Sequence, residues 1–78
     1  MKLIKLTHRI FYRKNGDASS EIVSVYINID CITAIVETSK ETKELYKHQT
    51  RIIFNTDTNK QEVCEDIEQV IQAIKGGE

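Results

Sequence analysis

The fold is decided by the stretch Val63-Cys64-Glu65-Asp66-Ile67-Glu68-Gln69-Val70-Ile71-Gln72-Ala73-Ile74-Lys75. Four apolar residues of this stretch follow the spacing i, i+3, i+4 and i+7, which places them on one side of a helix. They are Ile67, Val70, Ile71 and Ile74. Asp66 precedes this stripe and Gln69 follows three residues later, the spacing of a capping box. The sequence therefore predicts a C-terminal helix that ends at Gly76-Gly77.

Upstream of this helix, apolar and polar residues alternate with the period of two that is typical of strands. The first strand is predicted over Leu3–Tyr12, with Ile4, Leu6, His8, Ile10 and Tyr12 toward the core and Lys5, Thr7, Arg9 and Phe11 mostly toward water. Asn15-Gly16-Asp17, within Arg13–Ser20, supplies the positive φ angles of a tight hairpin turn. The second strand is predicted over Glu21–Ile29, with Val23, Val25, Ile27 and Ile29 on one face and Ser24, Tyr26 and Asn28 on the other.

The alternation breaks at Asn28-Ile29-Asp30, where the apolar spacing changes from two to three. A turn at Asp30–Ile32, capped by the side chain of Asn28 or Asp30, would return the apolar residues to the core. Three further strands are then predicted over Ile32–Thr38, Thr50–Phe54 and Gln61–Cys64, and the turn formers Asn55-Thr56-Asp57-Thr58-Asn59 separate the last two. The polar segment Ser39–Gln49 is either a mobile loop or a single helical turn that Leu45 holds down.

These elements predict one α+β domain over residues 1–78, a small antiparallel sheet of about five strands with one C-terminal helix packed on one face. Each apolar side chain of the helix gains about 1.5–3 kcal/mol when it is fully buried, so the helix should lie across the sheet. One helix covers one face only. The opposite face, which carries Phe11, Tyr26 and Ile53, is then either wet or covered by a partner.

Three segments also resemble the small flagellar FlbD-type proteins and similar bacterial and phage proteins. They are Ile4-Lys5-Leu6-Thr7; Tyr26-Ile27-Asn28-Ile29-Asp30 with Ile32 and Ile35; and Thr50-Arg51-Ile52-Ile53-Phe54 leading to Val63, Glu65 and Val70. Asp66 stands where the family outline has Ser, which keeps the capping chemistry. The resemblance covers most of the chain outside Arg13–Ser20 and Lys40–Gln49. It implies the same small fold and carries over no catalytic residue.

Charge is distributed unevenly along a chain whose net charge is −1. Residues 1–16 carry five basic residues and no acidic one, whereas residues 62–78 carry five acidic residues against Lys75. Such polarity is typical of a solvated strand face, of pairing between the two ends within or between molecules, or of binding to an anionic partner.

The remaining residue types exclude several classes of protein. His8, His48, Cys31 and Cys64 are too far apart in sequence for the paired spacing of a structural zinc site, so no metal is expected. No serine or cysteine stands in a readable catalytic arrangement, and no glycine-rich phosphate loop occurs, so we expect no enzyme, cofactor or small-molecule substrate. No membrane-spanning segment or signal peptide is expected, and isolated cysteines are typical of buried free thiols in a cytoplasmic protein.

The sequence thus predicts a non-enzymatic interaction or assembly module, either self-associating or binding another protein. The candidate interaction face comprises Lys5, Arg9, Phe11, Arg13, Tyr26 and Ile53. The alternative is a nucleic-acid-binding accessory or regulatory protein, because basic and aromatic side chains on one sheet face can follow a phosphate backbone and stack on bases.

Overall fold

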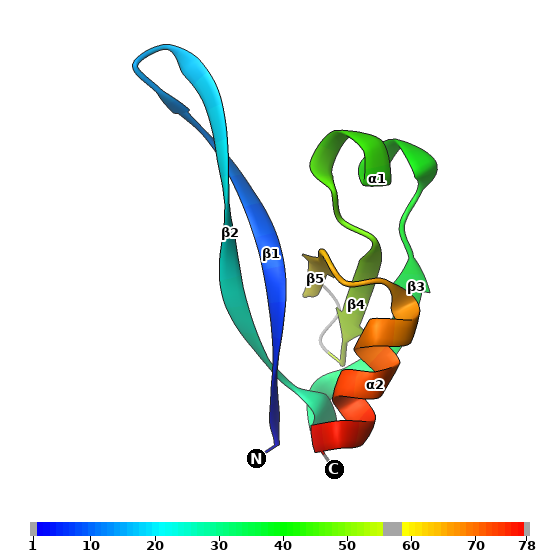
Figure 1. The fold of residues 1–78 in the computed structure, drawn as a ribbon. Coiled ribbons are helices and arrows are strands. Elements are labelled where there is room, and N and C mark those ends of the chain that lie inside the picture. Colours follow the sequence, from blue (N-terminus) through cyan, green and yellow to red (C-terminus); the bar gives the residue numbers. More distant parts are fainter. Residues whose placement is uncertain (1, 56–58, 78) are drawn as a thin grey trace.

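The computed structural model describes residues 2–55 and 59–77 and has an α+β fold, as predicted (Figure 1). The elements are β1 (Leu3–Lys14), β2 (Asp17–Asn28), a 3₁₀ turn η1 (Ile29–Cys31), β3 (Ile32–Glu37), α1 (Lys40–Tyr46), β4 (Thr50–Phe54), β5 (Lys60–Val63) and α2 (Ile67–Gly77). All strand pairs are antiparallel. The turn predicted at Asn55–Asn59 falls partly on residues 56–58, which lie outside the described residues.

The five strands form two sheets, β1-β2 and β3-β4-β5, rather than the single sheet that the sequence predicted. β1 lies beside the end of β5, where Cys64 N donates a hydrogen bond to Thr7 O at 2.8 Å. The neighbouring Thr7 N donates to both carboxylate oxygens of Glu65, at 3.0 and 3.1 Å. Because a side chain takes the place of the next backbone acceptor, the ladder between the two sheets does not continue.

The hairpin of β1 and β2 is longer than predicted because its turn uses only two residues. Asn15 and Gly16 have φ angles of 53° and 83°, the pair of positive values that a tight hairpin turn requires. Pairing then runs without interruption from Lys14 opposite Asp17 to Leu3 opposite Asn28. The distal part of the hairpin projects past the remainder of the molecule (Figure 1). The whole molecule is elongated, with principal extents of 43 × 25 × 24 Å.

The core lies between the base of the hairpin, the three-stranded sheet and α2. Its buried apolar residues are Ile4, Leu6, Ile27, Ile52, Val63 and Val70. All four of Ile67, Ile71, Ala73 and Ile74 on α2 are half-buried, but only Ala73 and Ile74 pack against this core. At 3.6 residues per turn, Ile67 and Ile71 lie about 60° and 100° to one side of Val70, and Ala73 lies about 60° to the other side. The predicted stripe is therefore correct at Val70 and Ile74, and the helix is rotated so that Ala73 replaces the other two.

Side-chain caps fix the ends of the turns, as the sequence predicted. At the start of α2, Gln69 N donates to Asp66 Oδ1 at 2.8 Å and Asp66 N donates to Gln69 Oε1 at 3.0 Å, so the capping box is confirmed. α2 nevertheless includes the two glycines at which the sequence had placed its end. At η1, Asp30 N donates to Asn28 Oδ1 at 3.0 Å, which identifies Asn28 as the capping residue.

The segment between β3 and β4 contains the short helix α1, which Ser39 caps by accepting a hydrogen bond from Thr42 N at 3.2 Å. Leu45 does not hold this helix down, because 58% of its surface is exposed. The base of the segment is closed instead by Thr38, whose Oγ1 donates to His48 O at 2.7 Å and whose N donates to Gln49 O at 3.2 Å. These bonds place His48 against the edge of β1.

Candidate functional site

Five of the six residues predicted for the interaction face lie on one face of the hairpin. They are Lys5, Arg9, Phe11, Arg13 and Tyr26. The register places Tyr26 directly opposite Lys5, and β1 residues two apart share a face. Ile53 does not belong to this group, because it lies on β4 in the other sheet, opposite Ala34 and Lys60. The prediction that all six residues share one wide sheet face is therefore wrong, because the strands form two separate sheets.

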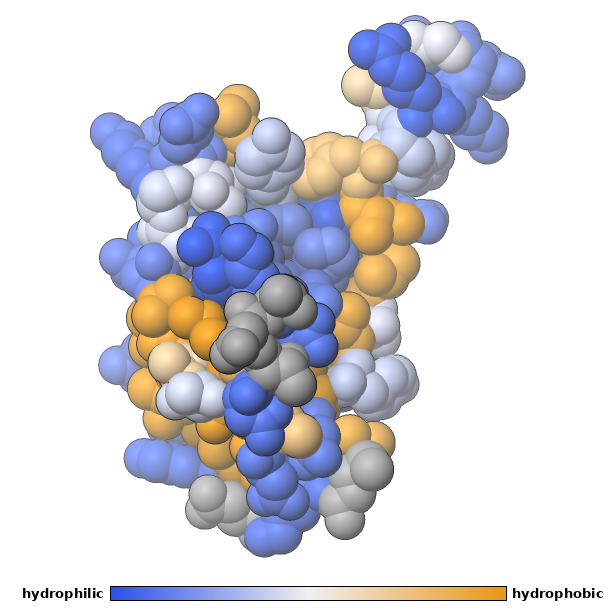
Figure 2. All heavy atoms as spheres, turned by 180° about the vertical axis from the view of Figure 1, so that it is seen from behind, coloured by the Kyte–Doolittle hydropathy of each residue, from blue (hydrophilic) through white to orange (hydrophobic). Residues whose placement is uncertain are grey.

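The hairpin carries more exposed apolar surface than the sequence predicted. On the predicted face, Phe11 is 49%, Ile22 54% and Tyr26 66% exposed; Ile22, opposite Arg9, was not among the candidates. On the other face, Ile10 and Tyr12 were expected in the core but are exposed. Figure 2 shows apolar side chains along the visible side of the hairpin, below its hydrophilic tip. The alternation of apolar and polar residues could not predict this exposure, because a strand keeps its period of two where it extends beyond the core.

Two of the candidate side chains on β1 are tied to neighbouring elements. Arg9 is half-buried and donates from Nη1 to Ser20 Oγ at 3.1 Å, while its buried Nε has no hydrogen-bond partner among the described residues. Phe11 meets Tyr46 of α1 edge-on, with ring centroids 5.6 Å apart and planes at 80°. Lys5, Arg13 and Tyr26 are exposed, so they are the candidate side chains most accessible to a partner.

A stacked pair of histidines joins the hairpin to the rest of the protein. The rings of His8 and His48 lie 4.5 Å apart and nearly parallel, at 8°. The Nδ1–H of His8 donates to the backbone carbonyl of Glu62 at 2.6 Å, and His8 is half-buried. His48 is buried, and its Nε2 lies 3.1 Å from Arg9 N and 3.2 Å from Arg9 O. The pair thus attaches the edge of β1 to β5 and to the segment before β4.

Burial lowers the pKa of His48 from its usual value, and the positive charge that His8 can carry lowers it further. The carboxylate of Glu62 opposes this shift, with Oε1 3.7 Å from His48 Nδ1. A neutral imidazole can use Nε2 either to accept from Arg9 N or to donate to Arg9 O. Glu62 favours the form with the proton on Nδ1, which leaves Nε2 to accept from Arg9 N.

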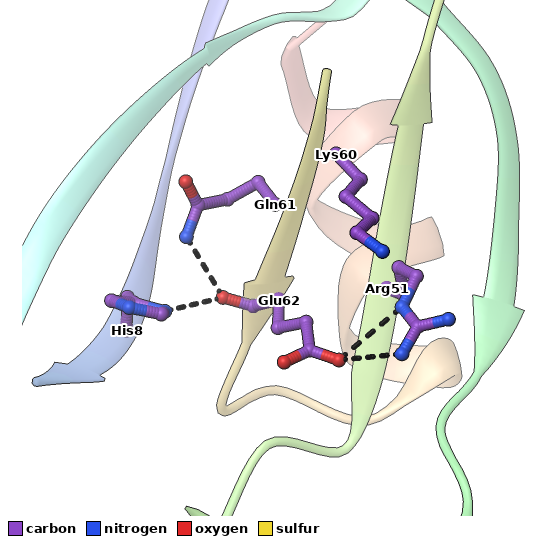
Figure 3. A pocket seen from close by; sticks show the side chains of 5 residues that line it. All are labelled: His8, Arg51, Lys60, Gln61 and Glu62. Atoms are coloured by element: carbon purple, nitrogen blue, oxygen red, sulfur yellow. Dashed lines mark hydrogen bonds and ion pairs between the residues drawn. The ribbon is translucent and has the colours of Figure 1, made fainter. Parts of the chain in front are cut away.

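A polar hollow of about 400 Å³ opens beside the histidines, lined by His8, Arg51, Lys60, Gln61 and Glu62 (Figure 3). Arg51 donates to Glu62 Oε2 from Nε at 3.2 Å and from Nη2 at 2.9 Å. Gln61 Nε2 donates to the same backbone carbonyl of Glu62 that His8 uses, at 3.0 Å. These contacts link β1, β4 and β5 through Glu62, so the polar groups of the hollow serve to join strands.

The other residues considered from the sequence are not gathered into a site. Cys31 and Cys64 are free thiols, as predicted, but they are half-buried rather than buried. Within residues 2–55 and 59–77, no three histidine, cysteine or acidic side chains are placed to hold a metal ion. In the same part of the chain, no helix is long and apolar enough to cross a membrane.

Comparison of the chain with protein-family models, with curated proteins and with solved structures gave no match. The relation to FlbD-type proteins therefore stays a prediction from the sequence. The candidate functional site is the hairpin surface itself.

Proposed function

We propose that this protein is a non-enzymatic assembly module of the cytoplasm that associates with further copies of itself through its long hairpin. The observation that carries the proposal is the exposed apolar surface of the hairpin. Ile10, Phe11, Tyr12 and Ile22 are each at least 36% exposed, on a part of the hairpin that projects from the core. Phe11 and Ile22 lie on one face of the hairpin and Ile10 and Tyr12 on the other. Apolar surface gathered on one exposed element in this way marks an interaction site.

The geometry of the hairpin supports this function in a second way. A two-stranded hairpin alone is marginally stable in water, because each strand has only one neighbour and neither face is covered. Here 12 residues in each strand pair in a regular register, although the core covers only the base. An additional surface laid against the hairpin would bury its apolar side chains and stabilise its distal part.

Sedimentation velocity over a range of protein concentrations tests self-association. We expect the average mass to rise with concentration, and the double substitution Phe11→Ser with Ile22→Ser to shift the association to higher concentration. Leu45→Ser is the control, because Leu45 is an apolar residue of similar exposure that lies on α1. A strict monomer at every concentration would contradict the proposal.

Binding to single-stranded nucleic acid is the second candidate function, and one observation favours it. Lys5 and Arg13 are exposed on the same hairpin face as Phe11 and Tyr26, so cations and rings alternate along one surface. Fluorescence anisotropy with a labelled oligonucleotide, repeated at several salt concentrations, measures this function directly. Binding through phosphates would weaken steeply with salt, and Lys5→Ala and Arg13→Ala would each reduce the salt dependence.

A further inference from the structure

The outer edge of β2 is an unprotected strand edge, and this follows from the register of the hairpin. Thr7 and Arg9 turn their backbone N–H and C=O groups toward the body, where Glu65, Cys64 and His48 bind them. Residues that face each other in an antiparallel pair point their backbone groups either both inward or both outward. Ser24, opposite Thr7, and Ile22, opposite Arg9, therefore present their N–H and C=O groups at the far side of the hairpin.

Nothing in the described residues covers this edge. The backbone hydrogen bonds outside the regular ladders use none of the backbone groups of Ala18–Tyr26, and β2 lies on the outside of the molecule (Figure 1). Proteins usually protect such edges with lysine, proline, a bulge or a very short strand. β2 has 12 residues in unbroken register and contains no lysine, arginine or proline. By contrast, the edge strand β3 has only six residues and an irregular register between Ile32 and Ala34.

The charges of the hairpin fit a second copy of the same edge. The cations Lys5, Arg9, Arg13 and Lys14 all lie on β1, and residues 22–28 of β2 carry no charge. When two β2 edges pair, the two β1 strands are separated by three strand spacings, about 14 Å. That separation exceeds the screening length of about 8 Å at physiological salt, so like charges are not brought together.

We infer that two copies pair antiparallel through β2, centred on Ser24, to form a four-stranded sheet across a two-fold axis. This inference rests on the proposed self-association and assigns it to the edge of β2, so that of the four exposed apolar residues that support the proposal it engages Ile22. The register places Ile22 of each copy opposite Tyr26 of the other, a pair of β-branched and aromatic side chains that stabilises sheets. On the second face it places Val23 opposite Val25, which already packs against the core, so the apolar layer continues from one copy into the next.

Proline at position 24 tests the edge with little effect on the hairpin. The N–H of Ser24 points outward, so Ser24→Pro removes no bond to β1 but removes one donor from each side of the proposed contact. In sedimentation equilibrium we expect dimerisation to weaken roughly 5- to 150-fold, as the loss of two hydrogen bonds implies. Ser24→Thr keeps the N–H and should dimerise like the wild type, and thermal unfolding checks that both variants are folded.

A charge substitution tests the register without altering the backbone. Ile22→Lys should weaken the dimer, whereas Val36→Lys, on the edge strand β3, should not. Adding Tyr26→Glu to Ile22→Lys should restore dimerisation, because the introduced ammonium of each copy would then face the introduced carboxylate of the other. Loss without this restoration overturns the Ser24-centred register.

The outcomes separate this inference from the proposed function. A dimer that survives both Ser24→Pro and Ile22→Lys overturns pairing through β2 but leaves self-association intact. A wild-type protein that stays monomeric at every concentration overturns both.

Discussion

The two halves of the hairpin differ in burial although they share the same strands, the same register and the same alternation. At the base, Ile4, Leu6 and Ile27 are no more than 5% exposed. Toward the tip, Ile10 and Tyr12 occupy the same face of β1 and are 36% and 41% exposed. The difference comes from α2 and the three-stranded sheet, which lie against the base only (Figure 1). An apolar residue in a strand is thus a core residue only where another element reaches it.

Substitution of one apolar residue in each half should give the largest contrast. Leu6→Ala removes a 2% exposed side chain and should lower the free energy of unfolding by about 2–5 kcal/mol through lost burial and a cavity. Ile10→Ala, on the same face four residues later, should cost less than about 1 kcal/mol in the monomer. Urea titration at low protein concentration measures both. Equal losses would show that the distal half is as well packed as the base.

The contact of Glu65 with Thr7 ties the packed half of β1 to the segment that follows β5. Glu65→Ala removes the acceptor of Thr7 N and of Thr7 Oγ1, the latter at 2.9 Å, and should cost about 1–3 kcal/mol because these part-buried donors lose their partner. Glu68→Ala, an exposed acidic residue in the first turn of α2, is the control and should change stability by less than about 0.5 kcal/mol. A smaller loss for Glu65→Ala than for its control would rule out this carboxylate as a link between the sheets.

The cap at the base of the hairpin should have an intermediate effect. Asn28→Ala removes the oxygen that accepts from Asp30 N and should lower the free energy of unfolding by about 1 kcal/mol, as the loss of a cap does. Asn28→Asp keeps an acceptor and should retain most of the stability. If Asn28→Ala were fully stable but failed to associate, Asn28 would belong to the interaction surface rather than to the turn.

The smallest effect at neutral pH is expected from the protonation of His48, because the neutral form already dominates there. Its pKa is lowered on folding by burial and by His8, so the unfolded chain binds the proton more tightly. Stability should therefore be complete above the unfolded value of 6.5 and should decrease as the pH falls below it. His48→Gln should flatten this part of the curve of unfolding free energy against pH. An unchanged slope would assign the pH dependence to other groups.

The local elements of this protein follow from short stretches of its sequence. Asn15-Gly16 set the hairpin turn, Asn28 and Asp66 set their caps, and the alternation around Ile4, Leu6 and Ile27 set a buried strand face. These features depend on backbone angles, short-range hydrogen bonds and side-chain direction, all of which act within a few residues. For this reason these elements could be predicted from the sequence alone.

The arrangement of those elements and the candidate site depend instead on contacts between segments that are distant in sequence. Whether β1 continues its ladder to β5 depends on Glu65, which is 58 residues from Thr7 in sequence and takes the position of a backbone acceptor. The split into two sheets separates Ile53 from the hairpin face. The limited reach of α2 leaves Ile22 exposed, and the stacking of His8 on His48 joins segments that are 40 residues apart. Such contacts join distant segments, and the local pattern of residues does not encode which segments meet.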